Sequence, residues 1–197
     1  MKFIYNKKKI IQVNVIKSLY VSLFLISTAA QALEGGGELH KTDHEGGYGY
    51  SFSVGDSFSN QSPFNWQVSY NRVQNVAINW NKSDIDFSLD TLDLGLSYRY
   101  SFQSYDKFVK SLFVEFKAGL GIAITENKFE WPELNENKYF SEQGDVNPFL
   151  AASLHKKLTK NTSMQIGVKY YPNYSEFDSL ASLYIGINYR FGRQVGY

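Results

Sequence analysis

The sequence predicts an all-β protein: an antiparallel, up-and-down, eight-stranded transmembrane β-barrel preceded by a cleaved signal peptide. Apolar and polar residues alternate along several runs, such as 64–71 and 183–191. Successive side chains of a strand point to opposite sides, so each run has one apolar and one polar face. Aromatic residues make up 17% of the chain, which is typical of the aromatic girdles at membrane interfaces. Charged and amide groups recur on the faces opposite the apolar ones, which favours a polar interior.

The first 32 residues have the order of a secretory signal peptide. Lysines without any acidic residue come first, an apolar stretch follows at 19–26, and small residues at 30–32 precede the expected cut. A single membrane-anchoring helix is the alternative, but the apolar stretch falls short of the roughly 20 residues that span a bilayer. We therefore predict that residues 1–32 are removed during export.

Composition narrows the class of the remaining chain. Removal of 32 residues that carry five lysines and no acidic residue would leave 165 residues and change the formal charge from +1 to −4. That length suits one domain, and that charge gives no reason to expect nucleic acid. The absence of cysteine excludes disulfides, thiolate metal sites and a cysteine nucleophile. A mean hydropathy of −0.33 is compatible with a transmembrane barrel, whose lipid-facing and lumen-facing residues average out.

We expect residues 33–46 to be a flexible, Gly-rich periplasmic leader and residues 47–197 to form the barrel. The eight candidate strands are 47–57, 64–72, 74–81, 86–102, 108–125, 146–158, 162–171 and 180–193. In the fourth, the apolar phase changes near Thr91, because Phe87 and Leu89 are odd-numbered whereas the apolar residues from Leu92 onward are even-numbered. Such a change predicts a β-bulge.

The lengths of the connections predict an orientation. Long polar connections at 126–145 and 172–176 alternate with a tight turn at 159–161. Bacterial outer-membrane barrels have short periplasmic turns and longer outer loops. The long connections are therefore expected outside, with both chain ends on the inner side. By the same count, the short connections at 60–63 and 81–84 also lie outside.

The polar faces of the last five candidate strands predict a packed, charged lumen. An eight-stranded barrel is only wide enough for side chains to fill its interior, and an unpaired charge there would be costly. We expect Arg99, Lys117, Lys169 and Arg190 to pair with Asp93 and Glu115 inside the barrel. The alternative is a soluble sandwich or lipocalin-like barrel in which these groups face water.

At this point the chain resembles the small outer-membrane barrels of Gram-negative bacteria, of the OmpA, OmpX and opacity-protein type. The resemblance covers about residues 47–197, and its most specific part is the alternating run 183–191. It implies a bare monomeric barrel in the cell outer membrane, in contact with outer-membrane lipid and lipopolysaccharide. It also implies a C-terminal aromatic signal for the barrel assembly machinery, for which the candidates are Tyr189, Phe191 and Tyr197.

No catalytic, cofactor or metal site is expected. Some barrels of this family act on lipid A, and the 3-O-deacylase uses a His-x-Ser pair with a glutamate. Here His155 is followed by two lysines rather than by that serine. His40 and His44 have a spacing that would hold a metal on a helix, but the glycines around them oppose a helix, so we expect adventitious binding at most.

These observations predict a non-enzymatic outer-membrane barrel with a packed polar lumen. Its surface loops, chiefly 126–145, would serve envelope integrity or surface interaction. Two alternatives stay open, a lipid A-modifying enzyme and a narrow pore. The crowded lumen argues against the pore.

Overall fold

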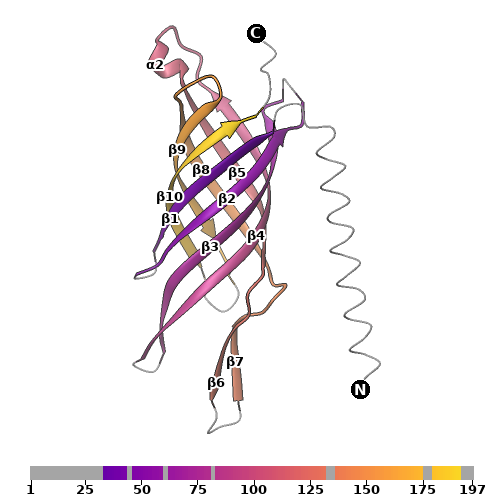
Figure 1. Cartoon of the computed structure of the whole chain (residues 1–197), viewed down its shortest axis with the longest axis vertical. Coiled ribbons are helices and arrows are strands. Elements are labelled where there is room, and N and C mark those ends of the chain that lie inside the picture. Colours follow the sequence, from indigo (N-terminus) through magenta and orange to yellow (C-terminus); the bar gives the residue numbers. More distant parts are fainter. Residues whose placement is uncertain are drawn as a thin grey trace, which may run out of the picture. The chain divides into compact units, whose positions relative to one another are not determined.

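Eight antiparallel strands close into one barrel, in the order β1-β10-β9-β8-β5-β4-β3-β2 (Figure 1). The structure is a computed structural model that describes residues 33–43, 46–59, 62–80, 83–131, 136–174 and 179–191, with side chains described outside 77–85 and 129–140. The predicted fold class is therefore confirmed. The predicted signal peptide lies outside the described residues.

The barrel strands agree with most of the predicted ranges. They are β1 (Glu34–Thr42), β2 (Tyr48–Ser57), β3 (Phe64–Trp80), β4 (Ser83–Ser101), β5 (Leu112–Ala123), β8 (Val146–Lys157), β9 (Thr162–Tyr171) and β10 (Leu180–Arg190). A separate two-stranded sheet, β6 (Asn127–Trp131) and β7 (Glu136–Ser141), lies in the connection between β5 and β8. One short helix, α2 (Lys107–Lys110), lies between β4 and β5 and is capped by the Asp106 carboxylate.

Strand β1 closes the barrel, because it pairs with both β2 and β10. Glu34 lies opposite Gly55 on one side and Arg190 on the other. Closure leaves no sheet edge, so the backbone N–H and C=O groups of the barrel find partners inside the sheet, as a lipid environment requires.

The prediction that residues 33–46 form a flexible leader is wrong, because residues 34–42 are β1. The glycines that suggested flexibility fit a crowded part of the sheet. A Cβ at Gly36 would lie 2.1 Å from Asn188 Oδ1, so any other residue there would require the Asn188 side chain to move. The candidate strands 64–72 and 74–81 are in turn one strand, β3. The count of eight was right because these two errors offset each other.

The bulge lies on β3 rather than on β4. The pairing of these strands shifts between Val73 and Val76, where Asn75 has a φ of 55°. Strand β4 passes Thr91 without interruption. Its apolar phase changes because Phe87 and Leu89 point into the lumen at one end, whereas Leu94 and Leu96 point outward nearer the other. The change of phase that predicted a bulge on β4 therefore reflects apolar side chains in one part of the lumen.

Apolar side chains cover the outside of the barrel and polar side chains fill most of the inside. On β5, Phe116 and Leu120 are about half exposed, whereas Glu115, which directly precedes Phe116, is 1% exposed. On β10, Ile187 points outward and Asn188 inward. This arrangement fits a bilayer outside and a hydrated or ion-paired interior. Within the described residues, no helix combines the length and apolarity needed to cross a membrane.

The two ends of the barrel differ. One end, here called the loop end, carries the connections 43–47, 81–82, 124–145 and 172–179. The other, the termini end, carries the connections 58–63, 102–111 and 158–161, and there the Phe191 N–H donates to the Leu33 carbonyl over 2.7 Å. The two connections predicted to be long, 126–145 and 172–176, share one end, as predicted, whereas the connection 102–111, which contains α2, lies at the termini end. The connection 58–63 lies at the opposite end from the predicted one, because the two candidate strands that follow it are the single strand β3.

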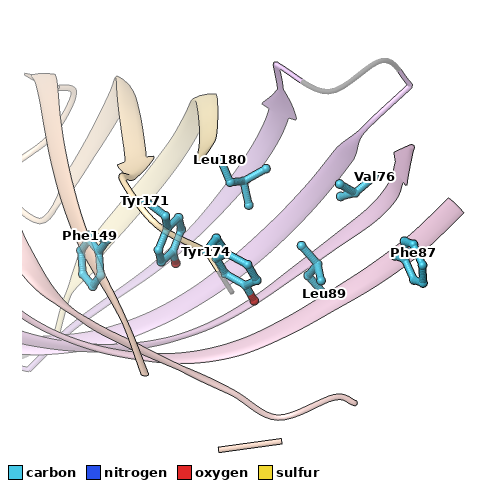
Figure 2. Packing of buried hydrophobic residues seen from close by; sticks show 7 residues of the cluster. All are labelled: Val76, Phe87, Leu89, Phe149, Tyr171, Tyr174 and Leu180. Atoms are coloured by element: carbon cyan, nitrogen blue, oxygen red, sulfur yellow. The ribbon is translucent and has the colours of Figure 1, made fainter. Parts of the chain in front are cut away.

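An apolar cluster fills the interior toward the loop end. Figure 2 shows its members, which are Val76, Phe87, Leu89, Phe149, Tyr171, Tyr174 and Leu180. Tyr174 comes from the connection after β9, yet it is 1% exposed and meets the Tyr171 ring edge-on at 5.2 Å between centroids. The cluster therefore closes this end of the lumen with side chains from strands and from one loop.

Candidate functional site: the charged lumen

Ion pairs begin at the termini end with two arginines around one carboxylate. Arg99 donates from Nη1 and Nη2 to the two oxygens of Glu34, over 2.9 and 2.8 Å. Arg190 Nη2 donates to Glu34 Oε2 over 3.1 Å. Bidentate hydrogen bonds of this kind are the strongest that a guanidinium makes with a carboxylate. Because β1 and β4 are three strands apart around the barrel, the Arg99 contact crosses the lumen.

Glu115 on β5 is the central carboxylate of the network. Its Oε1 accepts from Arg99 Nε over 2.9 Å and from the Ser97 hydroxyl over 2.7 Å. Its Oε2 lies 3.5 Å from Lys117 Nζ and 3.2 Å from His155 Nε2. Several donors therefore surround a side chain that is almost fully buried, which offsets the cost of removing its charge from water.

A second buried carboxylate, Glu38 on β1, lies further along the lumen. It accepts from Gln165 Nε2 and from the Ser51 hydroxyl, both over 2.7 Å. Lys117 Nζ lies 3.9 Å from it, although β5 and β1 are on opposite sides of the barrel. His40 Nε2 lies 3.3 Å from it. Lys117 therefore lies between Glu38 and Glu115 and links their two clusters.

The last ion pair before the apolar cluster joins Asp93 on β4 to Lys169 on β9. The Tyr171 hydroxyl also donates to Asp93, over 2.7 Å, and Lys169 Nζ donates to Asn71 Oδ1 over 3.2 Å. Lys169 Nζ lies 4.6 Å from the centroid of the Phe149 ring, a distance suited to a cation–π contact. This pair forms the boundary between the charged and the apolar parts of the lumen.

The six lumen residues named from the sequence all point inward. They are Asp93, Arg99, Glu115, Lys117, Lys169 and Arg190. Three of the four cations contact the carboxylates expected for them. Arg190 instead pairs with Glu34. Sequence reasoning missed Glu34 and Glu38 because it assigned them to the leader. The signal that would have found them is the alternation of polar Glu38 and His40 with apolar Leu39.

His155 is enclosed in the lumen and has a serine two positions before it. The Ser153 hydroxyl lies 2.9 Å from His155 Nε2, and Glu115 Oε2 lies 3.2 Å from the same nitrogen. A serine–histidine–carboxylate relay needs the serine on one ring nitrogen and the carboxylate on the other. Here both are on Nε2, and the stacked Phe113 ring lies 4.3 Å away between centroids. The geometry suits a packed histidine better than a general base.

His40 lies in the lumen wall rather than in a leader. Its Nε2 lies 3.1 Å from the Ser51 hydroxyl and its Nδ1 lies 3.4 Å from the Ser182 hydroxyl. The other half of the predicted pair, His44, lies outside the described residues. Among the residues that the structure describes, no group of three or more histidine and carboxylate side chains is arranged to hold a metal.

Comparison with solved structures gives the class of the fold. Neisserial surface protein A matches with a TM-score of 0.56 at 15% identity, over 81% of this chain and 96% of that one. The fold is that of the small outer-membrane β-barrels. No family model and no curated protein matches the sequence.

Two further solved structures match with slightly lower TM-scores. A transmembrane β-barrel designed de novo has a TM-score of 0.49 at 15% identity, over 82% of this chain and 97% of that one. Ail of Yersinia pestis, in complex with the heparin analogue sucrose octasulfate, has a TM-score of 0.48 at 14% identity, over 81% of this chain and 97% of that one.

This outer-membrane barrel has the apolar exterior and the charged lumen that suit a barrel embedded in a bilayer. Aromatic rings gather on its outer face near the termini end, where Phe64 meets Tyr98 at 5.3 Å and Tyr189 meets Phe191 at 4.9 Å between ring centroids. Rings of this kind favour the headgroup region of a bilayer. Of the predicted assembly signal, Tyr189 and Phe191 therefore face outward in this belt, and Tyr197 lies outside the described residues.

Cavities in the outer-membrane barrel are small inside and larger at one mouth. Two cavities along the charged lumen have volumes of about 20 Å³ each, enough for a single water molecule. At the termini end the lumen widens into a cavity of about 340 Å³ around Glu34, Arg99 and Arg190. The polar interior is therefore filled by its own side chains except at this mouth.

Proposed function

We propose that this protein is a non-enzymatic barrel that stabilises the envelope and presents its loop end to partners at the cell surface. The observation that carries the proposal is the filled lumen. Arg99 and Lys117 connect carboxylates on facing walls, and the apolar cluster closes the loop end. A barrel filled in this way is a rigid support for surface loops.

The connections support an orientation with the loop end outside the cell. The longest of them, 124–145, lies there and contains the β6–β7 hairpin. Periplasmic turns of outer-membrane barrels are short, and 158–161 at the termini end is such a turn. We assign surface interaction chiefly to this hairpin, and contact with lipopolysaccharide to the outer face near it.

The other partners follow from the same arrangement. Tyr189 and Phe191, on the outer face at the end of the chain's last strand, are the aromatic residues that we expect the barrel assembly machinery to recognise. The closure of the barrel supports a monomer, because its eight strands leave no edge to pair with a second chain.

The two alternatives have less support. A narrow pore would need a continuous water path, but the cavities between the ion pairs each hold about one water. A lipid A-modifying enzyme would need an accessible nucleophile and base, but Ser153 and His155 are both buried inside the barrel.

Conductance measurements in planar bilayers test the filled lumen. The refolded protein should give no stable current steps at voltages where a porin of known conductance, used as control, opens. Regular steps from the wild-type protein would contradict the proposal. Mass spectrometry of lipid A from cells with and without the protein tests the absence of enzymatic activity, and a mass change that requires His155 would favour the enzyme instead.

A further inference from the structure

The mouth of the lumen at the termini end is a cavity with an excess of positive charge. It has a volume of about 340 Å³, within the range of small-molecule sites. Four of the side chains that line it are cationic, namely Arg99, Lys157, Lys160 and Arg190, and one is acidic, Glu34. A concave wall of one charge concentrates small ions of the opposite charge.

Part of this positive charge is already neutralised inside the barrel. Glu34 bonds both Arg99 and Arg190, and Arg99 also bonds Glu115. The ion pair of Arg190 uses a single guanidinium nitrogen, Nη2. The remaining N–H groups of that side chain are available at the mouth, since a guanidinium carries five.

Lys157 adds a cation whose position is fixed without a carboxylate partner among the described residues. Its Nζ lies 5.8 Å from the centroid of the Phe113 ring, and its backbone N–H donates to the Ser111 carbonyl over 2.8 Å. Phe113 also lines the cavity, so the ammonium group lies beside its apolar wall. Lys157 is therefore held at the mouth by strand pairing and by ring contact.

The turn that carries Lys160 is also held in place. The Arg190 N–H donates to the Asn161 carbonyl over 2.8 Å, and Asn161 Nδ2 donates to the Arg190 carbonyl over 3.1 Å. The Thr159 hydroxyl accepts from the Thr162 N–H over 3.0 Å. The cations of the turn and of β10 therefore belong to one connected wall.

From this geometry we infer that the mouth binds a small oxyanion, a phosphate or a group with two carboxylates. Arginine and lysine side chains around one concavity are the groups that proteins use for such anions. The anion would lie between Lys157, Lys160 and Arg190, above the Arg99–Glu34 pair. Two sources share this chemistry, a soluble phosphate or carboxylate compound and the phosphodiester of a lipid headgroup. This site adds to the proposed surface role and does not depend on it.

Titration calorimetry of the full-length protein in zwitterionic detergent, with inorganic phosphate and with citrate as probes, tests the inference. We expect saturable binding that weakens as salt increases. The double variant Lys157→Gln and Lys160→Gln should weaken it at least tenfold. Both lysines are exposed, so the barrel should still fold, which heat-modifiable migration on gels would verify.

The matched control is the double variant Lys107→Gln and Lys110→Gln, which removes the same charge from α2 at the same end of the barrel. These two lysines do not line the cavity. Equal weakening in both double variants, or no saturable binding of either probe by the wild type, would overturn the inference.

Nanodiscs distinguish the two sources of the anion. If a soluble compound is the ligand, phosphate should bind equally in discs of phosphatidylcholine and in discs that also contain phosphatidylglycerol. If a lipid headgroup is the ligand, phosphatidylglycerol should compete with phosphate, and the competition should require Lys157. Either result supports the oxyanion site, whereas competition that persists unchanged in the Lys157→Gln, Lys160→Gln variant would contradict it.

Discussion

Arg99 and Glu34 join walls of the barrel that are three strands apart, through two hydrogen bonds of 2.9 and 2.8 Å. Residues that distant around the barrel meet only because the sheet is closed. The same arginine donates from Nε to Glu115 on the neighbouring strand. One guanidinium thus links β1, β4 and β5 at the termini end, next to the Arg190 side chain that shares Glu34.

Removing the charge of Glu34 should destabilise the barrel. Glu34→Gln leaves Arg99 and Arg190 close together without the carboxylate between them. Loss of one partner from a fully buried pair costs about 3 to 5 kcal/mol, and we expect roughly 3 kcal/mol because this mouth is open to water. Urea unfolding in lipid vesicles measures it. Glu142→Gln, an exposed carboxylate before β8, is the control and should change little.

A charge on the outer face should oppose insertion into a bilayer. Leu120 on β5 is 50% exposed, on the face assigned to lipid. Leu120→Arg should cost roughly 2 to 4 kcal/mol in vesicles, as expected for arginine near the midplane. Tyr105→Arg adds the same side chain at a fully exposed position between β4 and α2 and should cost little. Equal stability of the two variants would contradict the assignment of the faces.

Gly119 should not accept any side chain. A Cβ there would lie 2.2 Å from the Leu94 carbonyl oxygen and 2.8 Å from the Phe149 ring. The backbone cannot easily move away, because β5 is paired on both sides. Gly119→Ala should therefore destabilise by about 1 to 3 kcal/mol. Gly37→Ala, where the nearest atom is 3.9 Å from the new Cβ, is the matched control and should be tolerated in the same unfolding assay.

The sequence predicted the later strands well, since their two-residue alternation is strong. The predicted range 162–171 is the observed range of β9, and 146–158 differs from β8 by one residue. A period of two also fixes which face each residue occupies, so Asp93, Glu115 and Lys169 could be assigned to the lumen from sequence.

The first strand could not be recognised in the same way. On the outward face of β1, Gly35 and Gly37 offer no side chain, and Leu39 is the one large apolar residue. Where one face of a strand consists largely of glycine, the sequence does not show the alternation of apolar and polar residues. The ion pairs across the lumen could not be predicted from the sequence either. Barrel closure and strand tilt decide that Arg99 meets Glu34 and that Lys117 meets Glu38.

The loop end should lose stability in alkaline solution through Tyr174. Burial raises the pKa of this phenol well above its usual value of 10.0. In the unfolded chain the phenol ionises near pH 10, whereas in the folded barrel it stays neutral, so its contribution is present below pH 10 and is lost as the pH rises further. Tyr174→Phe keeps the ring against Tyr171 and removes the titrating group.

Urea unfolding in detergent between about pH 8 and pH 11 measures this contribution. The wild type should lose more stability than Tyr174→Phe across that interval. Tyr105→Phe, which alters a fully exposed tyrosine, is the control and should follow the wild type. If Tyr174→Phe instead has the same pH profile as the wild type, the phenol is accessible to water, and Tyr174 does not belong to the closure of the lumen.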